Sequence, residues 1–366
     1  MSGKNIIIKR LFQHWPARIA SCIILGTFII AIFAYAFAPD NSPDANDMIV
    51  ELSARPVGFK QQFFLLPKQN APSESNIFQG IFIGKPQAHS LIPMNGFSVH
   101  NDSILIWHYI DDQLEDTLIY ALSNLNFHDK DLKNQIKKNI ITKKFYLGTD
   151  RYGRDILSRL IIGSRVSIAV GLVSVILSIG IGIFLGSLAG WYGGILDDSV
   201  MWFINILWSI PTLLLVFAIT LTIGKGFWEI FIAIGLTSWV TAARLIRGQV
   251  MQIKEMDFIT AAKALGFKDS RIIFKHILPN IAGPIMVIAS ANFATAILVE
   301  AGLSFLGIGV QPPTPSWGLM IKEHYTFLVA GNPVPALIPG LAIMILVLAF
   351  NILGNALRDA IDVREK

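Results

Sequence analysis

The sequence is poor in charge and almost without cysteine. Only 15% of its 366 residues are Asp, Glu, Lys or Arg, whereas 53% are hydrophobic, and the net charge is +5. These proportions exclude a disordered chain and argue against an ordinary soluble domain, in which about a quarter of the residues are charged. The single Cys22 excludes a disulfide framework and a cysteine-based zinc site. The composition fits a membrane protein, whose basic excess belongs to cytoplasmic loops and implies no nucleic-acid partner.

Apolar segments without charge divide the chain into candidate membrane spans. A bilayer core requires a helix of about 20 apolar residues. The candidates are Ile19–Ala38, Val166–Ala189, Val200–Gly224, Ile230–Ala243, Ile281–Val299 and Ala336–Leu357. The fourth is short enough to be a re-entrant or interfacial segment, but Glu229 and Arg244 could snorkel from its ends, and we interpret it as a span. The first resembles a signal peptide in outline, yet its length favours an uncleaved helix.

Basic residues set the expected orientation. They cluster at the N-terminus, between residues 244 and 275, and in the C-terminal tail, and six spans place all three segments in the cytoplasm. We therefore divide the chain into a cytoplasmic N-terminus with the first span (1–38), an extracytoplasmic insertion (39–145) and a five-helix core (146–366) with a cytoplasmic loop at 255–279. The expected fold is an all-α polytopic membrane protein with six transmembrane helices and an enlarged segment between the first two.

The insertion at residues 39–145 is the compositional outlier. It holds no spanning run, and its short apolar pieces at residues 63–66 and 104–107 predict strands or short helices. About 105 residues could form a small domain, and an irregular cap on the membrane part is an equal alternative. Its histidines lack the close spacing of metal ligands, so we interpret them as surface or packing residues and predict no metal site: His89, His100, His108 and His128.

The segment before the second span has a helical apolar pattern. Apolar residues recur at i, i+1, i+4 and i+5 from Ile156 to Ile161, with Arg154, Asp155 and Arg159 between or beside them. This pattern predicts an amphipathic helix at the membrane interface.

Particular residues within the spans suggest how the helices pack. Gly182, Gly186 and Gly190 follow at intervals of four, which allows two helix backbones to approach closely; the alternative is a glycine-rich span without a special partner. Pro211 and Pro284 could each kink a helix.

Glu300 is the ionisable residue near the outer end of the fifth span. It could touch cargo in a pore, pair with a neighbouring subunit or form a local hydrogen bond. We favour the last two.

The cytoplasmic loop at residues 257–279 predicts two short helices. Asp257 can cap the first, Gly266 can end it in the left-handed conformation, and the second must end near Pro279. One apolar face of the first helix is formed by Phe258, Ala261, Ala262 and Leu265. We expect this face to dock into the groove of a soluble partner, although packing on neighbouring loops would produce the same pattern.

This loop resembles the EAA loop of ABC-transporter permeases, in which Glu-Ala-Ala, three residues, Gly and nine residues precede Ile-x-Leu-Pro. Thr260-Ala261-Ala262, Gly266 and Leu278-Pro279 keep that spacing, while Thr260 replaces the Glu and His276 replaces the Ile. The loss of the Glu removes any acidic contact with the partner there and leaves the small-residue face.

Three further segments are similar to the dipeptide/oligopeptide branch, the DppC/OppC-like subunits. They are Leu-Gly-Thr-Asp-Arg-Tyr-Gly-Arg-Asp at 147–155, Val-Glu-Ala-Gly-Leu-Ser-Phe-Leu-Gly at 299–307 and Pro-Pro-Thr-Pro-Ser-Trp-Gly at 312–318. The insertion is longer than in most members, and the YejE-like branch carries an enlarged segment there.

The resemblance implies one half of a pore in the bacterial inner membrane. It implies a second permease subunit (DppB/OppB-like), two ATPase subunits that bind ATP and Mg, an extracytoplasmic substrate-binding protein, and import of peptides or a similar small solute. The chain itself would bind no cofactor and catalyse no reaction. The coupling contact with an ATPase would fall on these residues: Asp257, Phe258, Thr260, Ala261, Ala262, Leu265, Gly266 and Pro279.

Two other classes of function lack their expected residues. The chain has no Gly-x-x-x-x-Gly-Lys-Ser/Thr loop, so its energy must come from a partner or an ion gradient. A stand-alone secondary transporter predicts intramembrane carboxylates or repeat symmetry. A membrane hydrolase predicts a nucleophile–base set or metal ligands at membrane depth. We find neither pattern, and we expect no role for His276 and His324, which lie outside the spans.

Overall fold

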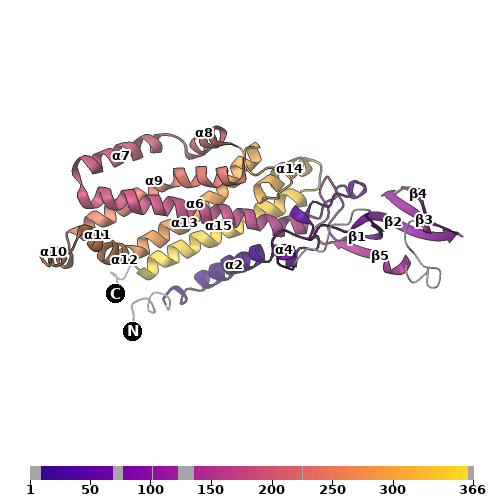
Figure 1. Ribbon diagram of the computed structural model, residues 1–366, viewed down its shortest axis with the longest axis horizontal. Coiled ribbons are helices and arrows are strands. Elements are labelled where there is room, and N and C mark those ends of the chain that lie inside the picture. The colour runs from indigo at the N-terminus through magenta and orange to yellow at the C-terminus, as the bar shows by residue number, and fades with distance from the viewer. Residues whose placement is uncertain (1–9, 69–76, 101, 123–135, 225, 362–366) are drawn as a thin grey trace.

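The computed structural model describes residues 10–68, 77–100, 102–122, 136–224 and 226–361. The molecule is elongated, with a bundle of long helices at one end and a small β-sheet at the other (Figure 1). Helix α2 (Trp15–Ile32) begins, and helix α15 (Val334–Ile361) ends, at the end of the bundle opposite the sheet. The short helices α10 (Asp257–Ala264), α11 (Asp269–Ile272) and α12 (Leu278–Asn280) also lie there.

The described residues contain five single helices long and apolar enough to cross a membrane: α2 (Trp15–Ile32), α6 (Ile156–Tyr192), α9 (Phe227–Lys254), α13 (Ala282–Leu306) and α15 (Val334–Ile361). A sixth candidate span is the pair α7 (Gly194–Ser209) and α8 (Thr212–Ile223), which is bent by 95°. Pro211 lies at this bend, where a residue without a backbone N–H interrupts the helical hydrogen bonds. The predicted fold class is confirmed.

The helices depart from the predicted spans in three places. The amphipathic helix expected before the second span does not exist as a separate element, because α6 runs unbroken from Ile156. Helix α9 is longer than its charge-free segment, because its last turns carry the basic residues that begin at Arg244. The helix is not interrupted at Pro284 itself but just before it, at Ile281, whose non-helical backbone separates α12 from α13.

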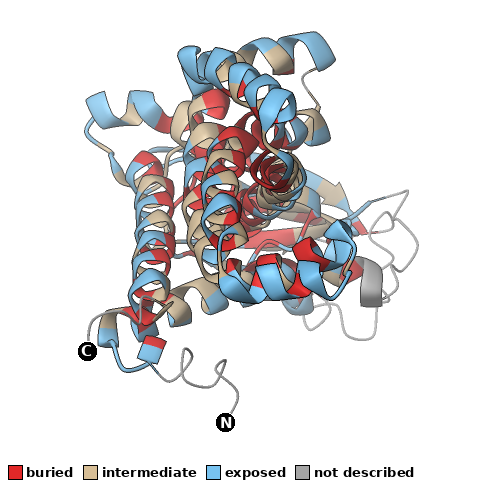
Figure 2. Ribbon diagram, turned by 90° about the vertical axis from the view of Figure 1, so that its left-hand side faces the viewer, coloured by how far each residue is buried: buried red, intermediate tan, exposed pale blue. Residues whose placement is uncertain are grey.

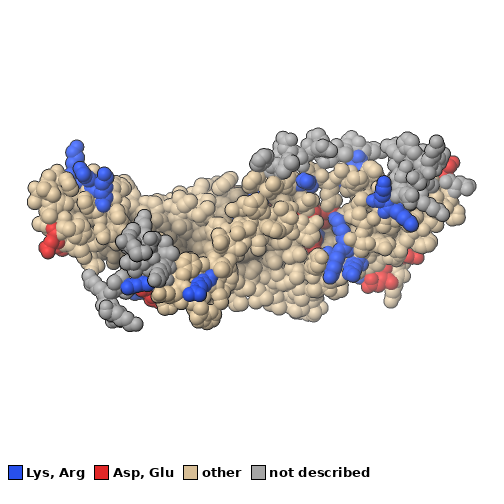
Figure 3. Space-filling model, turned by 90° about the horizontal axis from the view of Figure 1, so that it is seen from below, with Lys and Arg blue, Asp and Glu red and all other residues tan. Residues whose placement is uncertain are grey.

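Charge is distributed as a membrane requires. On the face shown in Figure 3, the Lys, Arg, Asp and Glu side chains gather at the two ends of the molecule and leave an uncharged band between them. Figure 2 looks along the bundle, where buried residues face the space between the helices and exposed residues face outward. The outer faces of the bundle are therefore apolar and exposed, as for helices that contact lipid or another subunit.

The insertion contains a five-stranded antiparallel sheet of order β4-β3-β2-β1-β5. Its strands are β1 (Phe59–Pro67), β2 (His89–His100), β3 (Ser103–Asp111), β4 (Leu114–Ala121) and β5 (Ile140–Phe145). The apolar pieces at 63–66 and 104–107 lie in β1 and β3. Phe64, Ile104 and Ile106 are fully buried in a cluster of the sheet's own residues.

Short elements join the sheet to the bundle: the helices α3 (Ala34–Phe37) and α4 (Ile77–Phe82) and the 3₁₀ turns η1 (Pro43–Ala45) and η2 (Val50–Leu52). Among the predicted packing histidines, the His108 ring lies 3.4 Å from a carboxylate oxygen of Glu51. His128 lies outside the described residues.

Helices α6 and α9 form the most extensive helix pair among the described elements. The three glycines of α6 face α9, so that a Cβ built on Gly182 would lie 2.7 Å from the Cβ of Ala242. The corresponding distance is 2.5 Å from Gly186 to the Ala243 carbonyl oxygen and 2.8 Å from Gly190 to the Arg247 carbonyl oxygen. Glycine at these positions lets the two backbones touch.

We expect Gly186→Ala to destabilise the protein by about 1–3 kcal/mol, because the new methyl group must push the two backbones apart. Gly180→Ala is the matched control in the same helix, since a Cβ there meets nothing within 4 Å. Its effect should be neutral or stabilising, because alanine favours a helix by about 1 kcal/mol over glycine. Thermal unfolding of the purified variants in detergent measures both, and equal melting temperatures would contradict the close approach.

Candidate functional site

Helix α10 (Asp257–Ala264) follows the C-terminal end of α9. Its N-cap is Met256, and Asp257 is the first helical residue, so the cap predicted at Asp257 is wrong by one position. At the other end the Phe267 N–H donates to the Ala262 carbonyl, and the Gly266 N–H donates to the Lys263 carbonyl. This Schellman pair requires the left-handed conformation that Gly266 adopts, with φ of 73°.

The apolar residues of α10 are divided between two faces. Ile259 and Ala262 are buried in a cluster that also contains residues of α6 and α9. Phe258 is 42% exposed, Leu265 is 73% exposed, and Ala261 is exposed as well. Ala262 therefore packs on its own chain, and its predicted place on the partner-facing surface is wrong. Thr260 is exposed on the outer side of the helix.

The second helix of the loop is irregular. It comprises α11 (Asp269–Ile272), the π-helical turn η5 (Ile273–Ile277) and α12 (Leu278–Asn280), and it ends one residue after Pro279. The proline has no N–H to donate, and the wide turn before it replaces a regular helical turn. Phe274 on this turn is 67% exposed, which adds a third large apolar side chain, after Phe258 and Leu265, to the exposed surface of the loop.

Contacts with cations fasten the loop to the bundle. The Lys254 ammonium donates to the Trp191 carbonyl at the end of α6, with 2.7 Å between the atoms. The ammonium of Lys263 on α10 lies 4.7 Å from the centre of the Trp191 ring. Trp191 of α6 thus contacts α9 through Lys254 and α10 through Lys263.

Two arginines of α9 hold the otherwise exposed helix α7. Arg247 forms a two-pronged ion pair with Asp197, and one of its bonds is 2.5 Å long. Arg244 donates to the Asn205 side chain at 2.7 Å and lies 3.6 Å from the centre of the Trp208 ring. The planar guanidinium group suits both kinds of contact.

A buried network of charges lies at the opposite end of the bundle. Arg154 donates through Nε to Asp150 at 2.6 Å and through a terminal nitrogen to Glu323 at 2.9 Å. Arg159, also fully buried, lies 3.5 Å from Glu323 and 4.0 Å from Asp150. Glu323 belongs to α14 (Trp317–Val329), so the network joins the start of α6 to that helix.

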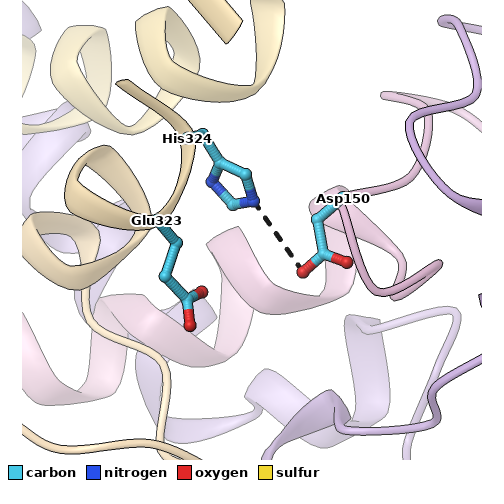
Figure 4. Close-up of side chains that lie close together, drawn as sticks. All are labelled: Asp150, Glu323 and His324. Carbon is cyan, nitrogen blue, oxygen red and sulfur yellow. Dashed lines mark ion pairs between the residues drawn. The ribbon is translucent and has the colours of Figure 1, made fainter. Parts of the chain in front are cut away.

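His324 completes this network (Figure 4). Its Nδ1 lies 2.6 Å from the Met320 carbonyl oxygen, and its Nε2 lies 3.8 Å from a carboxylate oxygen of Asp150. Ligand atoms of Asp150, Glu323 and His324 lie within 4.8 Å of one another, close enough for a metal ion. However, Arg154 and Arg159 already balance the two carboxylates, and a dication would leave two extra buried charges. The residues fit an ion network better than a metal centre.

The environment of Asp150 keeps its carboxylate ionised. Burial alone would raise its pKa, but His324, Arg154 and Arg159 lower the pKa from 3.8 to about 2. A carboxyl group whose pKa is lowered on folding stabilises the folded state above its unfolded pKa. This contribution is present above about pH 4 and is lost as the pH falls toward 2.

The sequence did not indicate this network. Arg154 and Arg159 were assigned to the polar face of an interfacial helix, and no role was expected for His324; both interpretations are wrong, because all three side chains are buried. The available signal was the concentration of Asp and Arg at residues 150–159. Their partners in α14 lie far away in the sequence and show no pattern of their own.

Glu300 forms a local hydrogen bond. It is 1% exposed, and one of its carboxylate oxygens accepts from the Ser304 hydroxyl at 2.6 Å. Of the three alternatives considered for this residue, the local bond is the one present within the chain.

Comparison with known proteins places these features in a family. The family model described as "Binding-protein-dependent transport system inner membrane component" matches residues 182–366. The oligopeptide transport system permease protein OppC of Bacillus subtilis is 41% identical over 221 residues, which cover 60% of this chain and 72% of that protein. The glutathione transport system permease protein GsiD of Pectobacterium atrosepticum is also 41% identical, over 60% of this chain and 73% of that protein.

A dipeptide transport system permease protein, DppC of Alkalihalophilus pseudofirmus, is 42% identical over 60% of this chain and 72% of its own length. Among solved structures, the inward-facing MetNI methionine ABC transporter has a chain 20% identical, with a TM-score of 0.47 and coverage of 56% of this chain and 97% of that one.

The chain belongs to the family of binding-protein-dependent transport permeases. It is a multi-pass inner-membrane permease subunit of an ABC importer of the dipeptide/oligopeptide type, and it is a non-catalytic membrane component. The resemblance inferred from the EAA-like loop is thereby confirmed.

We expect Arg154→Met to destabilise the protein by about 3–5 kcal/mol, because it leaves the buried carboxylates of Asp150 and Glu323 with only the longer contacts of Arg159. Asp112→Asn is the control, since it removes one side of an ion pair with Arg55 at a position whose side chain is 70% exposed. That change should cost less than about 1 kcal/mol. Denaturation monitored in detergent measures both, and similar small losses would contradict a stabilising role for the network.

Proposed function

We propose that this chain forms half of the translocation pore of an ATP-driven importer of short peptides or chemically similar solutes. Residues 257–279 receive the motion of a partner ATPase and pass it to the membrane helices. The pore is completed by a second permease subunit (DppB/OppB-like), and an extracytoplasmic binding protein delivers the cargo. ATP and Mg bind to two ATPase subunits, and this chain binds neither.

The exposed apolar side of α10 carries the proposal. Phe258, Ala261 and Leu265 are exposed at the end of a basic segment, while Ile259 and Ala262 anchor the same helix to the bundle. A short helix with one anchored side and one free apolar side suits a groove on a soluble partner. The anchored side matters as much, because these packing contacts help to pass a push on α10 to the bundle.

The peptide cargo is inferred from the relatives. Their names describe transport of oligopeptides, dipeptides and glutathione, and these solutes share amide groups and charged termini. We propose the same chemical class for this permease.

The distribution of basic residues supports one orientation of the chain in the membrane. The loop at 244–275 is basic, and positively charged segments stay in the cytoplasm. We propose that both termini and α10 are cytoplasmic and that the sheet is extracytoplasmic.

Neighbouring alanines allow the coupling function to be tested. Ala261→Asp should abolish transport and the cargo-dependent ATPase activity of the reconstituted importer, because it puts a charge on the exposed side of α10. Its melting temperature should be unchanged. Ala262→Asp should instead lower the melting temperature by several degrees, because it buries an unpaired carboxylate.

Ala261→Ser is the matched conservative control and should retain both activities. If α10 is merely packed on its neighbours, Ala261→Asp will transport normally. That result would reject the coupling function without affecting the family assignment.

Single-cysteine labelling tests the orientation. With Cys22 replaced by Ser, a cysteine at exposed Ile119 of β4 should react with a membrane-impermeant maleimide on intact cells or spheroplasts. A cysteine at exposed Leu265 should react only after the membrane is permeabilised. The reverse pattern of labelling would overturn the proposed topology.

A further inference from the structure

A pocket lies between the insertion and the membrane helices, at the end of the bundle that carries the sheet. Its volume is about 370 Å³, which is within the range of small-molecule sites. Its walls come from α3, η1, α4, the N-terminal part of α6, the start of α9 and the segment before α14. The lining combines an acid, a base, two hydroxyl groups and aromatic rings: Tyr35, Asp44, Phe82, Arg165, Phe227 and Thr314.

The acid of the pocket, Asp44, lies on a strained turn. Its φ is 59°, and that of Ala45 is 44°, which is a left-handed conformation at two successive residues that carry a Cβ. Two hydrogen bonds hold the turn: the Asp44 N–H donates to the Tyr35 hydroxyl at 3.2 Å, and the Ala45 N–H donates to the Ser42 carbonyl at 2.9 Å. Strain of this kind persists only where the surroundings impose it, and it clusters at ligand sites.

The base of the pocket, Arg165, is held by the opposite wall. Its Nη1 donates to the Phe82 carbonyl at 2.7 Å, and its guanidinium lies 5.2 Å from the centre of the Tyr35 ring. The segment after α4 is itself fastened beside η1, because the Lys85 N–H donates to the Asn41 carbonyl at 2.8 Å. The bond to Phe82 uses one of the five N–H donors of the guanidinium, so the group is positioned without being used up.

The acid and the base do not neutralise each other directly. Within the described residues, neither Asp44 nor Arg165 has an ion pair of 4.0 Å or less. Burial raises the pKa of Asp44, and the Thr314 side chain and the charge of Arg165 offset that rise only in part. A cationic group bound beside Asp44 would complete the compensation. The pocket therefore offers one place for a positive group and another for a negative group.

Apolar side chains form the rest of the wall. Phe82 is 51% exposed and the adjacent Ile83 is 63% exposed, while Phe227 is half-buried, with its ring centre 4.5 Å from that of Phe231. Apolar surface beside a few convergent polar groups is typical of a binding site for an organic ligand. A lone metal cation would face Arg165 and a lone anion would face Asp44, so the lining suits neither.

We propose that this pocket binds the two ends of a short zwitterionic peptide, with the ammonium at Asp44, the carboxylate at Arg165 and an apolar side chain against Phe82. The proposal rests on the proposed function, because it locates a contact for the cargo of a peptide importer. Asp44 and Phe82 belong to the insertion, whereas Arg165 belongs to α6. The insertion thus supplies one half of the site and the membrane core the other.

Peptides with blocked ends test the site on the full chain, purified in detergent. Calorimetry measures the binding of alanyl-phenylalanine, of its N-acetyl derivative and of its C-terminal amide. Each blocked derivative should bind at least about tenfold more weakly than the free dipeptide, because it loses one charge-assisted hydrogen bond. A parent that binds all three equally, or none of them, would overturn the proposal, and this comparison needs no variant.

Two variants assign each end of the peptide to its residue. Asp44→Asn should weaken binding of the free dipeptide at least about tenfold but leave binding of the N-acetyl derivative unchanged, because the two changes remove the same contact. Arg165→Gln should do the same for the free dipeptide and the amide. Asparagine tolerates the left-handed conformation, so Asp44→Asn should keep the turn. Arg151→Gln is the matched control, since it removes a guanidinium 4.6 Å from the Tyr152 ring, outside the pocket.

Two further measurements separate this site from other occupants and from the proposed function. Phosphatidylethanolamine also carries an ammonium and an anionic group, so binding of this lipid in nanodiscs without binding of the dipeptide would overturn the proposal. Import of alanyl-phenylalanine by the reconstituted importer is measured separately. Import without binding in the pocket would reject the site and leave the proposed function standing, whereas binding without import would support the site and reject the proposed function.

Discussion

The absence of water from the bilayer core is the constraint on which the rest of this structure depends. A helix that satisfies its own backbone hydrogen bonds can cross that core, and the charged side chains collect at the two ends of the molecule. Apolar helices gain little by leaving lipid for one another, so their association depends on the fit between their surfaces. The glycines of α6 supply that fit by letting its backbone touch α9. Helices α2, α7, α8 and α13 each pack on one or both members of this pair.

The two ends of the bundle use charge in different ways. At the end of the bundle that carries the sheet, Arg154 and Arg159 are buried between carboxylates of two elements. A buried ion pair is weak evidence for stability, but breaking one is expensive, so the network fixes how α14 sits on the start of α6. At the end that carries α10, Lys263 lies over the ring of Trp191, and the outer side of α10 stays exposed. Buried ion pairs thus fix the packing at one end of the bundle, whereas α10 has an exposed surface at the other end.

How far each feature could be predicted depends on the range of the interaction behind it. Charge-free runs identified each candidate span found among the described residues, because burial in lipid constrains every residue of a helix. The left-handed turn at Gly266 could also be predicted, because it depends only on residues close to it in the sequence. Periodicity identified an apolar face on α10 but could not place Ala262 against its own chain and Ala261 outside, since that division is made by α9 and the second loop helix. The pair Arg154–Glu323 joins residues 169 positions apart, which one sequence cannot reveal. Apolar pieces indicated strands in the insertion, whereas the order of the sheet depends on pairings between distant segments.

The packing around α10 indicates how a push at that helix would travel. Ile259 and Ala262 share a cluster with Ile246 and Val250 of α9, and close-packed interiors transmit displacement instead of absorbing it. Movement of α10 would therefore reach α9 and, across the glycine contacts, α6. The adjoining elements are interrupted: α7 and α8 meet at a 95° bend, and non-helical Ile281 precedes α13. A rigid pair beside interrupted helices can convert a push on α10 into a change of shape among the membrane helices. Arg244 and Arg247 of α9 bind Asn205 and Asp197 of α7, so a displacement of α9 would also move α7.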